Sequence, residues 1–194
     1  MVVDVVAAEL DRVHERIAGR FGRAEPRARV REYVSGLVAG LERKNGWTLA
    51  EWAGEVSPDG MQRLLRRAGW DVDGVRDDVR GYVIKQLGDE DGVLIADDTG
   101  FLEKGIRSAG VQRQYSGTAG RTENCQVGVF LAYAVPARGT RVLVDRELYV
   151  PRSWTEDEQR CAAAGIGGDT GFATKPQLAR MMIERAVKAG LPFA

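Results

Sequence analysis

The apolar positions of the first 88 residues recur at the spacing of α-helices. Val5, Leu10 and Ile17 fall on one face of a predicted first helix. A second apolar series follows Pro26 and runs to Leu41, before Asn45-Gly46 interrupts it. Further helical patterns cover residues 48–53, 61–68 and 75–87, with Thr48 and Asp59 as expected N-caps of the first two. Residues 1–88 are therefore predicted to form a helical domain.

The pattern changes after Asp89. Residues 93–96 form a short apolar run typical of a buried strand. Residues 99–124 are rich in Gly, Ser and Thr without apolar periodicity, which predicts a long loop. Residues 125–135 and 140–150 are two runs rich in Val, Leu, Tyr and Phe, and the short Pro- and Gly-containing segment between them predicts a β-hairpin.

Two helical segments, 155–164 and 175–189, follow the hairpin. The last five residues, 190–194, have the character of the entry to another strand. Residues 89–194 are thus predicted to form an α/β domain (α+β in its segregation of helices and strands) whose sheet is incomplete.

Composition narrows the class of protein. The 194 residues contain 28 Lys and Arg against 28 Asp and Glu, and 44% are hydrophobic, which is enough for a packed core. Two Cys and one His exclude a disulfide scaffold and a zinc site. No apolar stretch approaches a membrane span, and the N-terminus lacks the pattern of a secretory signal. We expect a reduced, cytoplasmic protein with no membrane partner.

Two adjacent acids follow the first predicted strand. Asp97 and Thr99 share one face of an extended chain, while Asp98 points to the other face. Acids at such a position commonly hold Mg²⁺, which prefers oxygen ligands. The alternative is that Asp97 and Asp98 cap a turn at the end of the strand.

The predicted loop that follows is basic. From 104 to 121 it contains four cations and no acid, interleaved with Gly, hydroxyl and amide side chains. Such a segment suits contact with DNA phosphates, and an aromatic ring can stack on a base. The candidate DNA-binding residues are Lys104, Arg107, Arg113, Tyr115 and Arg121. A mobile, solvated surface loop is the alternative.

The helical domain contains a second basic region. Between Arg12 and Arg31 the sequence has seven Arg against two Glu. Residues 49–53 and 61–68, with a Ser-Pro turn between them, have the outline of a helix-turn-helix motif. Its second helix would present Arg63, Arg66 and Arg67 to DNA. Amphipathic helices with Arg on an ordinary wet surface give the same pattern.

Taken in order, these segments resemble a known family. The matching motifs are NGWTLAE (45–51), MQRLLRRA (61–68), RDDVR (76–80), DDTGF (97–101), QYSGT (114–118), NCQVGV (124–129) and DRELYVP (145–151). They resemble the DDE-superfamily transposases of bacterial insertion sequences, in particular the seven-oh-one subgroup. The resemblance runs from about residue 26 to the C-terminus.

The resemblance implies an RNase H-like catalytic domain whose first three strands are antiparallel. In this family three acids hold two Mg²⁺ (or Mn²⁺) ions that act in DNA strand cleavage and transfer. The Asp-x-Thr pattern makes Asp97 the expected metal ligand and Asp98 the second choice. The implied partner is double-stranded DNA at transposon ends, with Lys104, Arg107 and Arg113 near its phosphates, and the implied location is the nucleoid.

The sequence departs from the family at the other two acids. No Asp or Glu follows Glu184, and Asp145 does not match the position of the second acid. We therefore expect a truncated copy that does not cleave DNA, whose first strand has an open edge that favours a homodimer. The alternatives are a DNA-binding module that occupies transposon ends in competition with intact transposase, and a domesticated interaction protein.

Overall fold

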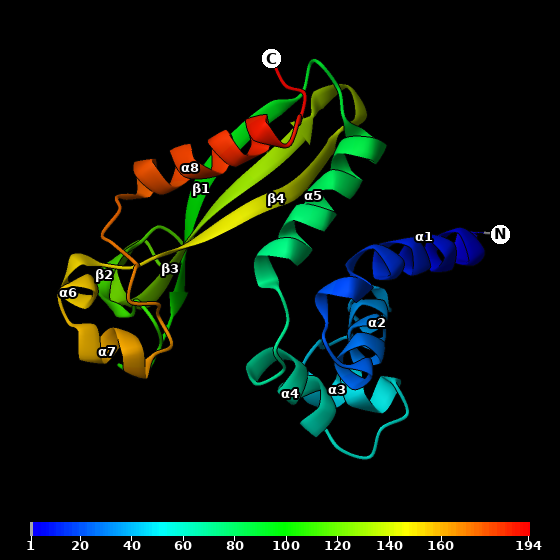
Figure 1. Cartoon of the computed structure of the whole chain (residues 1–194), viewed down its shortest axis with the longest axis horizontal. Helices are drawn as coiled ribbons and strands as arrows, with labels where there is room; N and C mark the ends of the chain where they lie inside the picture. Colours follow the sequence, from blue (N-terminus) through cyan, green and yellow to red (C-terminus); the bar gives the residue numbers. More distant parts are fainter. Residues whose placement is uncertain (1) are drawn as a thin grey trace. The chain divides into compact units, whose positions relative to one another are not determined.

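The computed structural model describes residues 2–194 and divides into two compact units, one ending at Tyr82 and the other beginning at Val83 (Figure 1). The division lies within helix α5, whose last turn packs with the second unit. No helix among residues 2–194 has the length and apolar character needed to cross a membrane.

The first unit is helical, as predicted. Its helices are α1 (Val2–Ile17), α2 (Ala24–Val38), α3 (Gly46–Trp52), α4 (Asp59–Arg66) and α5 (Val72–Leu87), with a short 3₁₀ turn after α1. Ile17, Phe21, Val30 and Leu64 form its main buried cluster. A second cluster of Leu49, Ala50 and Met61 joins α3 to α4.

The N-caps of two helices differ from prediction. Asn45, not Thr48, caps α3: its side chain accepts hydrogen bonds from the N–H groups of Trp47 and Thr48 at 2.9 and 3.1 Å. Thr48 completes a capping box from the third helical position. Asp59 is the first residue of α4, and Pro58 before it supplies no side-chain cap.

A four-stranded antiparallel sheet organises the second unit. Its strands are β1 (Val93–Leu102), β2 (Gln112–Ser116), β3 (Arg121–Val135) and β4 (Thr140–Tyr149). The long β3 is central: β1 pairs along one side, and β2 and β4 pair with successive parts of the other. The prediction of one long loop over 99–124 was wrong, because β1 continues into this segment as far as Leu102 and β2 forms a hairpin with β3, which begins at Arg121.

The predicted hairpin of the two apolar strands is confirmed, with Gly139 at φ 60° closing its turn. The helix predicted over 155–164 is instead two short helices, α6 (Arg152–Thr155) and α7 (Glu158–Ala163), because Asp157 starts a new helix by accepting the N–H of Arg160. Helix α8 (Lys175–Lys188) agrees with prediction.

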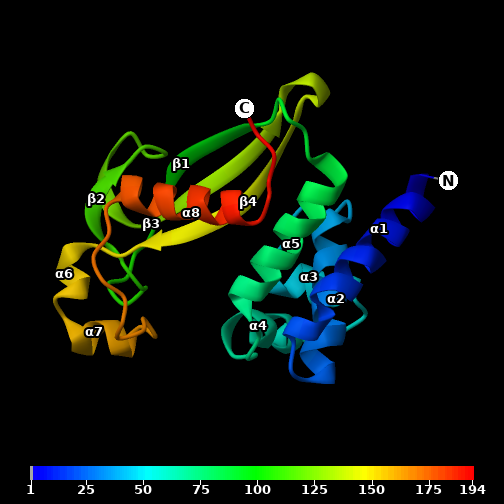
Figure 2. The same ribbon diagram turned by 45° about the horizontal axis from the view of Figure 1, so that its top comes forward.

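One face of the sheet is covered by α8, which lies along β3 and β4 in both views (Figures 1 and 2). Met182 and Ala186 of α8 are fully buried against Leu131 and Tyr133 of β3. Leu191 also joins this cluster. Residues 190–194 form no strand, contrary to prediction, although the N–H of Ala194 donates to the carbonyl of Gly92 at 2.9 Å.

A β-bulge in β4 adjusts which residues face α8. Leu131 pairs with Asp145 and the next residue, Ala132, pairs with Leu143, so Val144 is the extra residue. Val144 lies in the apolar cluster under α8, and Asp145 also faces α8, where Arg185 contacts it. Two consecutive residues of one strand therefore face the same side.

Candidate functional site

Asp97 and Asp98 lie in the middle of β1. Asp97 pairs with Phe130 of β3 and Asp98 with Val129, and the ladder continues to Leu102. The two acids therefore do not cap a turn at a strand end, and that alternative was wrong. Alternation along β1 places them on opposite faces of the sheet, as the sequence predicted.

Asp98 is on the face covered by α8. Its carboxylate forms an ion pair with Lys175, the first residue of that helix. The buried thiol of Cys125 lies on the same face, and burial raises its pKa. Asp98 is thus part of the contact between α8 and the sheet.

Asp97 is exposed on the opposite face. Its Oδ1 accepts the N–H of Asp98 at 2.8 Å, and no cation of residues 2–194 forms an ion pair with it. A hollow of about 350 Å³ surrounds it, lined by Thr99 and by the apolar side chains of Ile95, Phe101 and Phe130. The carboxylate is therefore free to meet a ligand from solvent.

The described residues do not complete a metal site around Asp97. Residues 2–194 contain no group of three or more His, Cys, Asp or Glu side chains able to hold a metal ion. Asp145 cannot join Asp97, because it is buried on the α8 face and accepts hydrogen bonds from Arg185 at 2.9 and 3.2 Å. Asp97 supplies one carboxylate, where two metal ions need several ligands.

Two predicted DNA-binding residues share the face of Asp97. Arg113 pairs with Asn124 and Tyr115 with Thr122 on β3, in the same alternating series as Phe130 opposite Asp97. Both side chains are exposed. Because the sequence predicted a loop here, this common face could not be foreseen.

The other cations of the predicted loop lie at the ends of strands or between them. Lys104 and Arg107 are exposed in the segment between β1 and β2. Arg121 begins β3 and forms an ion pair with Glu123 at 2.7 Å, so part of its charge is already matched.

The excess charge predicted for 12–31 is largely neutralised in the fold. Arg20 bonds Asp78 at 2.7 Å and Arg31 bonds Asp11 at 2.6 Å. Arg29 forms ion pairs with Glu32 and Glu55. Asp78 and Glu55 lie far from residues 12–31 in the sequence, so a charge count over that segment did not include them.

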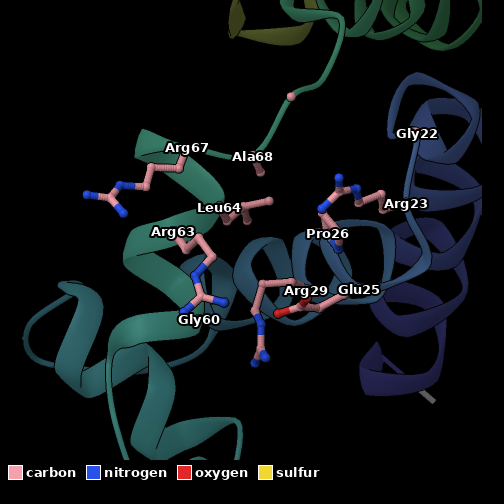
Figure 3. Close-up of a pocket in the computed structure, with 11 residues that line it drawn as sticks. Gly22, Arg23, Glu25, Pro26, Arg29, Gly60, Arg63, Leu64, Arg67 and Ala68 are labelled. Carbon is pink, nitrogen blue, oxygen red and sulfur yellow. The ribbon is translucent and has the colours of Figure 1, made fainter.

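A cationic pocket remains in the helical unit. It has a volume of about 500 Å³ and lies between the start of α2 and helix α4 (Figure 3). Arg63 of α4 and Arg67, the residue that follows this helix, lie on one side, and Arg23 lies on the other (Figure 3). Arg66 lines an adjoining hollow that also includes Arg63 and Arg67. The linker between α3 and α4, residues 53–58, is longer than the usual turn of a helix-turn-helix motif.

The second unit is an α+β domain that begins with antiparallel strands. One long helix, α8, covers one face of the sheet, and the exposed carboxylate of Asp97 lies on the other face. The sequence resemblance implied such antiparallel first strands for an RNase H-like domain.

Comparison with known proteins gives the family. The model of the DDE superfamily endonucleases matches residues 16–194, so the chain belongs to this family, whose fold is RNase H-like. The chain is 30% identical over 158 residues to a probable transposase for insertion sequence element IS701 from Microchaete diplosiphon. That match covers 81% of the chain but 38% of the relative's length. No solved structure gives a significant match.

Proposed function

We propose that this chain acts as part of an insertion-sequence transposase, with the helical unit holding double-stranded DNA and β1 presenting a carboxylate ligand for a divalent metal ion. Membership of the DDE superfamily supports this assignment. Divalent ions are the general cofactors of that superfamily.

The observation that carries the proposal is the difference between the two adjacent acids. Lys175 neutralises Asp98, whereas Asp97 is exposed beside Thr99 with no cation partner among residues 2–194. A hard cation such as Mg²⁺ or Mn²⁺ binds carboxylate oxygens that are accessible and not already matched. Asp97 is therefore the proposed metal ligand, and Asp98 is a structural residue.

The DNA contacts are proposed to come from both units. Exposed cations bind phosphates without regard to sequence, and an exposed ring offers a stacking surface. The proposed residues are Arg63, Arg66, Arg67, Lys104, Arg107, Arg113, Tyr115 and Arg121, of which Arg121 is the weakest because Glu123 pairs with it.

We also propose that the 194-residue polypeptide binds DNA without cleaving it. Phosphodiester chemistry of this family needs two metal ions, and residues 2–194 form no cluster of three metal-binding side chains. In this state the protein would occupy DNA ends as a binding module. Activity in a plasmid-nicking assay with Mg²⁺ or Mn²⁺, abolished by Asp97→Asn, would contradict this.

Paramagnetic broadening of NMR signals by Mn²⁺ tests the metal ligand, since it detects weak binding. In the unaltered chain we expect broadening of amides around Asp97 and Phe130, which pair across β1 and β3. Asp97→Asn should remove it, and the matched variant Asp98→Asn should keep it. Equal broadening in the unaltered chain and Asp97→Asn would reject Asp97 as the ligand.

A further inference from the structure

We propose that the cationic pocket of the helical unit binds a backbone phosphate of duplex DNA, with Arg23 as an anchoring residue that the sequence did not single out. The inference rests on the proposed DNA-directed function and names the point of contact. The pocket's volume of about 500 Å³ is within the usual range for ligand sites.

The charges around the pocket are unbalanced. Arg23, Arg63 and Arg67 are exposed, and none forms an ion pair within the described chain. Glu25 is the one acid in the lining. Cations gathered around one hollow repel each other, and a bound anion relieves that repulsion.

The floor of the pocket is a fixed ion-pair network. Arg29 is held by Glu32 and Glu55, so its own charge is matched. A Cβ at Gly60 would lie 2.8 Å from the Arg29 guanidinium and from the Glu55 carboxylate. The absence of a side chain at Gly60 thus lets this network sit directly against α4, and the free cations stand around its rim.

The start of α2 adds backbone donors. Arg23 is the N-cap residue of this 15-residue helix, and its side chain makes no capping hydrogen bond. The first N–H groups of a helix have no partner within the helix, and the positive end of the helix dipole favours an anion. Pro26, the third residue of α2, has no N–H, so the N–H groups of Ala24 and Glu25 supplement Arg23 on this side of the pocket.

The shape favours a polynucleotide over a small anion. A second hollow of about 250 Å³ adjoins the pocket and shares Arg63 and Arg67 with it. It adds Gln62, Arg66 and one acid, Asp59, so the lining of this hollow has three arginines against one carboxylate and the basic surface continues along α4. A row of cations along a helix matches the repeating phosphates of a DNA backbone, whereas a free phosphate would use one hollow.

The test compares Arg23→Gln with Arg43→Gln in the full chain. Each removes one exposed cation from the helical unit, and Arg43 lies outside the pocket. Binding to a short duplex DNA is measured by fluorescence anisotropy from about 50 to about 200 mM salt. Arg23→Gln should reduce the slope of log K against log salt by about one and weaken binding roughly five- to tenfold at about 100 mM salt, while Arg43→Gln should change neither.

Further arms separate the possible outcomes. Arg23→Lys keeps the charge and should keep the slope; loss of slope in that variant as well would indicate a structural role and overturn the proposal. Equal slopes in Arg23→Gln and Arg43→Gln would overturn the proposal that the pocket binds a DNA phosphate, but would leave the proposed function standing. Failure of the unaltered chain to bind DNA would instead reject the proposed function.

Titration with inorganic phosphate identifies the source of the anion. If millimolar phosphate binds and Arg23→Gln weakens that binding without affecting DNA, the site takes a small anion and the DNA assignment is wrong. If phosphate binds only weakly and Arg23→Gln weakens DNA binding, the assignment is supported. Circular dichroism of each variant confirms that the helical unit is folded.

Discussion

Lys175, the first residue of α8, forms an ion pair with Asp98 in the middle of β1. This contact distinguishes two chemically identical neighbours, because it engages Asp98 in holding the helix and leaves Asp97 exposed on the other face. The candidate site is therefore defined as much by the partner of Asp98 as by Asp97 itself.

Substitution of the two acids should separate stability from function. Asp98→Asn removes a partly exposed ion pair and should lower the free energy of unfolding by less than about 1 kcal/mol. Asp97→Asn should leave it nearly unchanged, because Asp97 has no ion pair among the described residues. Urea unfolding monitored by tryptophan fluorescence measures both, and a larger loss for Asp97→Asn would contradict the assignment.

Arg185 should be the most important charged residue of α8 for stability. It bonds the fully buried carboxylate of Asp145 and also bonds Glu147 at 2.6 Å. Although burial disfavours its charged form, hydrogen bonds and charge from Asp145 and then Glu147 raise the pKa of Arg185. Arg185→Met should cost about 2 to 4 kcal/mol, because it removes a cation that bonds both oxygens of a buried carboxylate.

Arg180 on the same helix is the matched control. It pairs with Glu184 at 2.8 Å, and both side chains are largely exposed. Arg180→Met should cost no more than about 0.5 kcal/mol in denaturant unfolding. Similar losses for the two variants would show that the buried cluster does not hold α8 to the sheet.

The phenol of Tyr133 should stabilise the entry to β1. It is fully buried, donates to the carbonyl of Asp89 and accepts the N–H of the same residue, both at 2.9 Å. Tyr133→Phe would leave these backbone groups without their partner and should cost about 1 to 3 kcal/mol. Tyr115→Phe is the control, because Tyr115 is exposed, and it should leave the free energy of unfolding nearly unchanged. Thermal unfolding of both variants measures the difference.

Acid should weaken the helical unit through Asp78. Hydrogen bonds from Arg20 at 2.7 and 3.0 Å outweigh partial burial and lower the pKa of Asp78. A carboxyl group with a lowered pKa in the folded state stabilises the fold above its unfolded value of about 4, and this contribution is lost as pH falls through the folded pKa. Asp78→Asn should therefore be less stable than the unaltered chain at pH 7, and the difference should vanish in acid.

Guanidine unfolding at a series of pH values tests this directly. A difference between the two proteins that persists well below pH 4 would show that Asp78 acts through packing and not through its charge.

The apolar pattern was sufficient to predict much of the fold. Periodic Val and Leu indicated the helices of the first unit, α8 and the β3–β4 hairpin, because burial of these side chains dictates those elements. Strand β2 escaped prediction because its residues, QRQYS, are mostly polar. Its place depends on backbone pairing with β3, which leaves no periodic apolar signature.

The candidate site was only partly accessible from sequence. Alternation along a strand was enough to place Asp97 and Asp98 on opposite faces. Two ion pairs, Lys175 with Asp98 and Arg185 with Asp145, could not be predicted. Each joins residues about 40 positions apart or more in the sequence, and no local pattern encodes such a contact. Arg23 was passed over because its importance comes from α4, which lies beside it only in the folded unit.

The extra residue in β4 adds a buried side chain beneath α8 without changing which face the later residues of that strand occupy. Deleting Val144 would restore a regular ladder, in which Leu143 and Asp145 become consecutive and keep their partners Ala132 and Leu131. Asp145 and Glu147 would therefore stay on the face covered by α8, and Arg146 and Leu148 would stay on the face of Asp97. A one-residue deletion would thus remove one apolar side chain from the cluster under α8, while the carboxylates that Arg185 contacts would keep their side of the sheet.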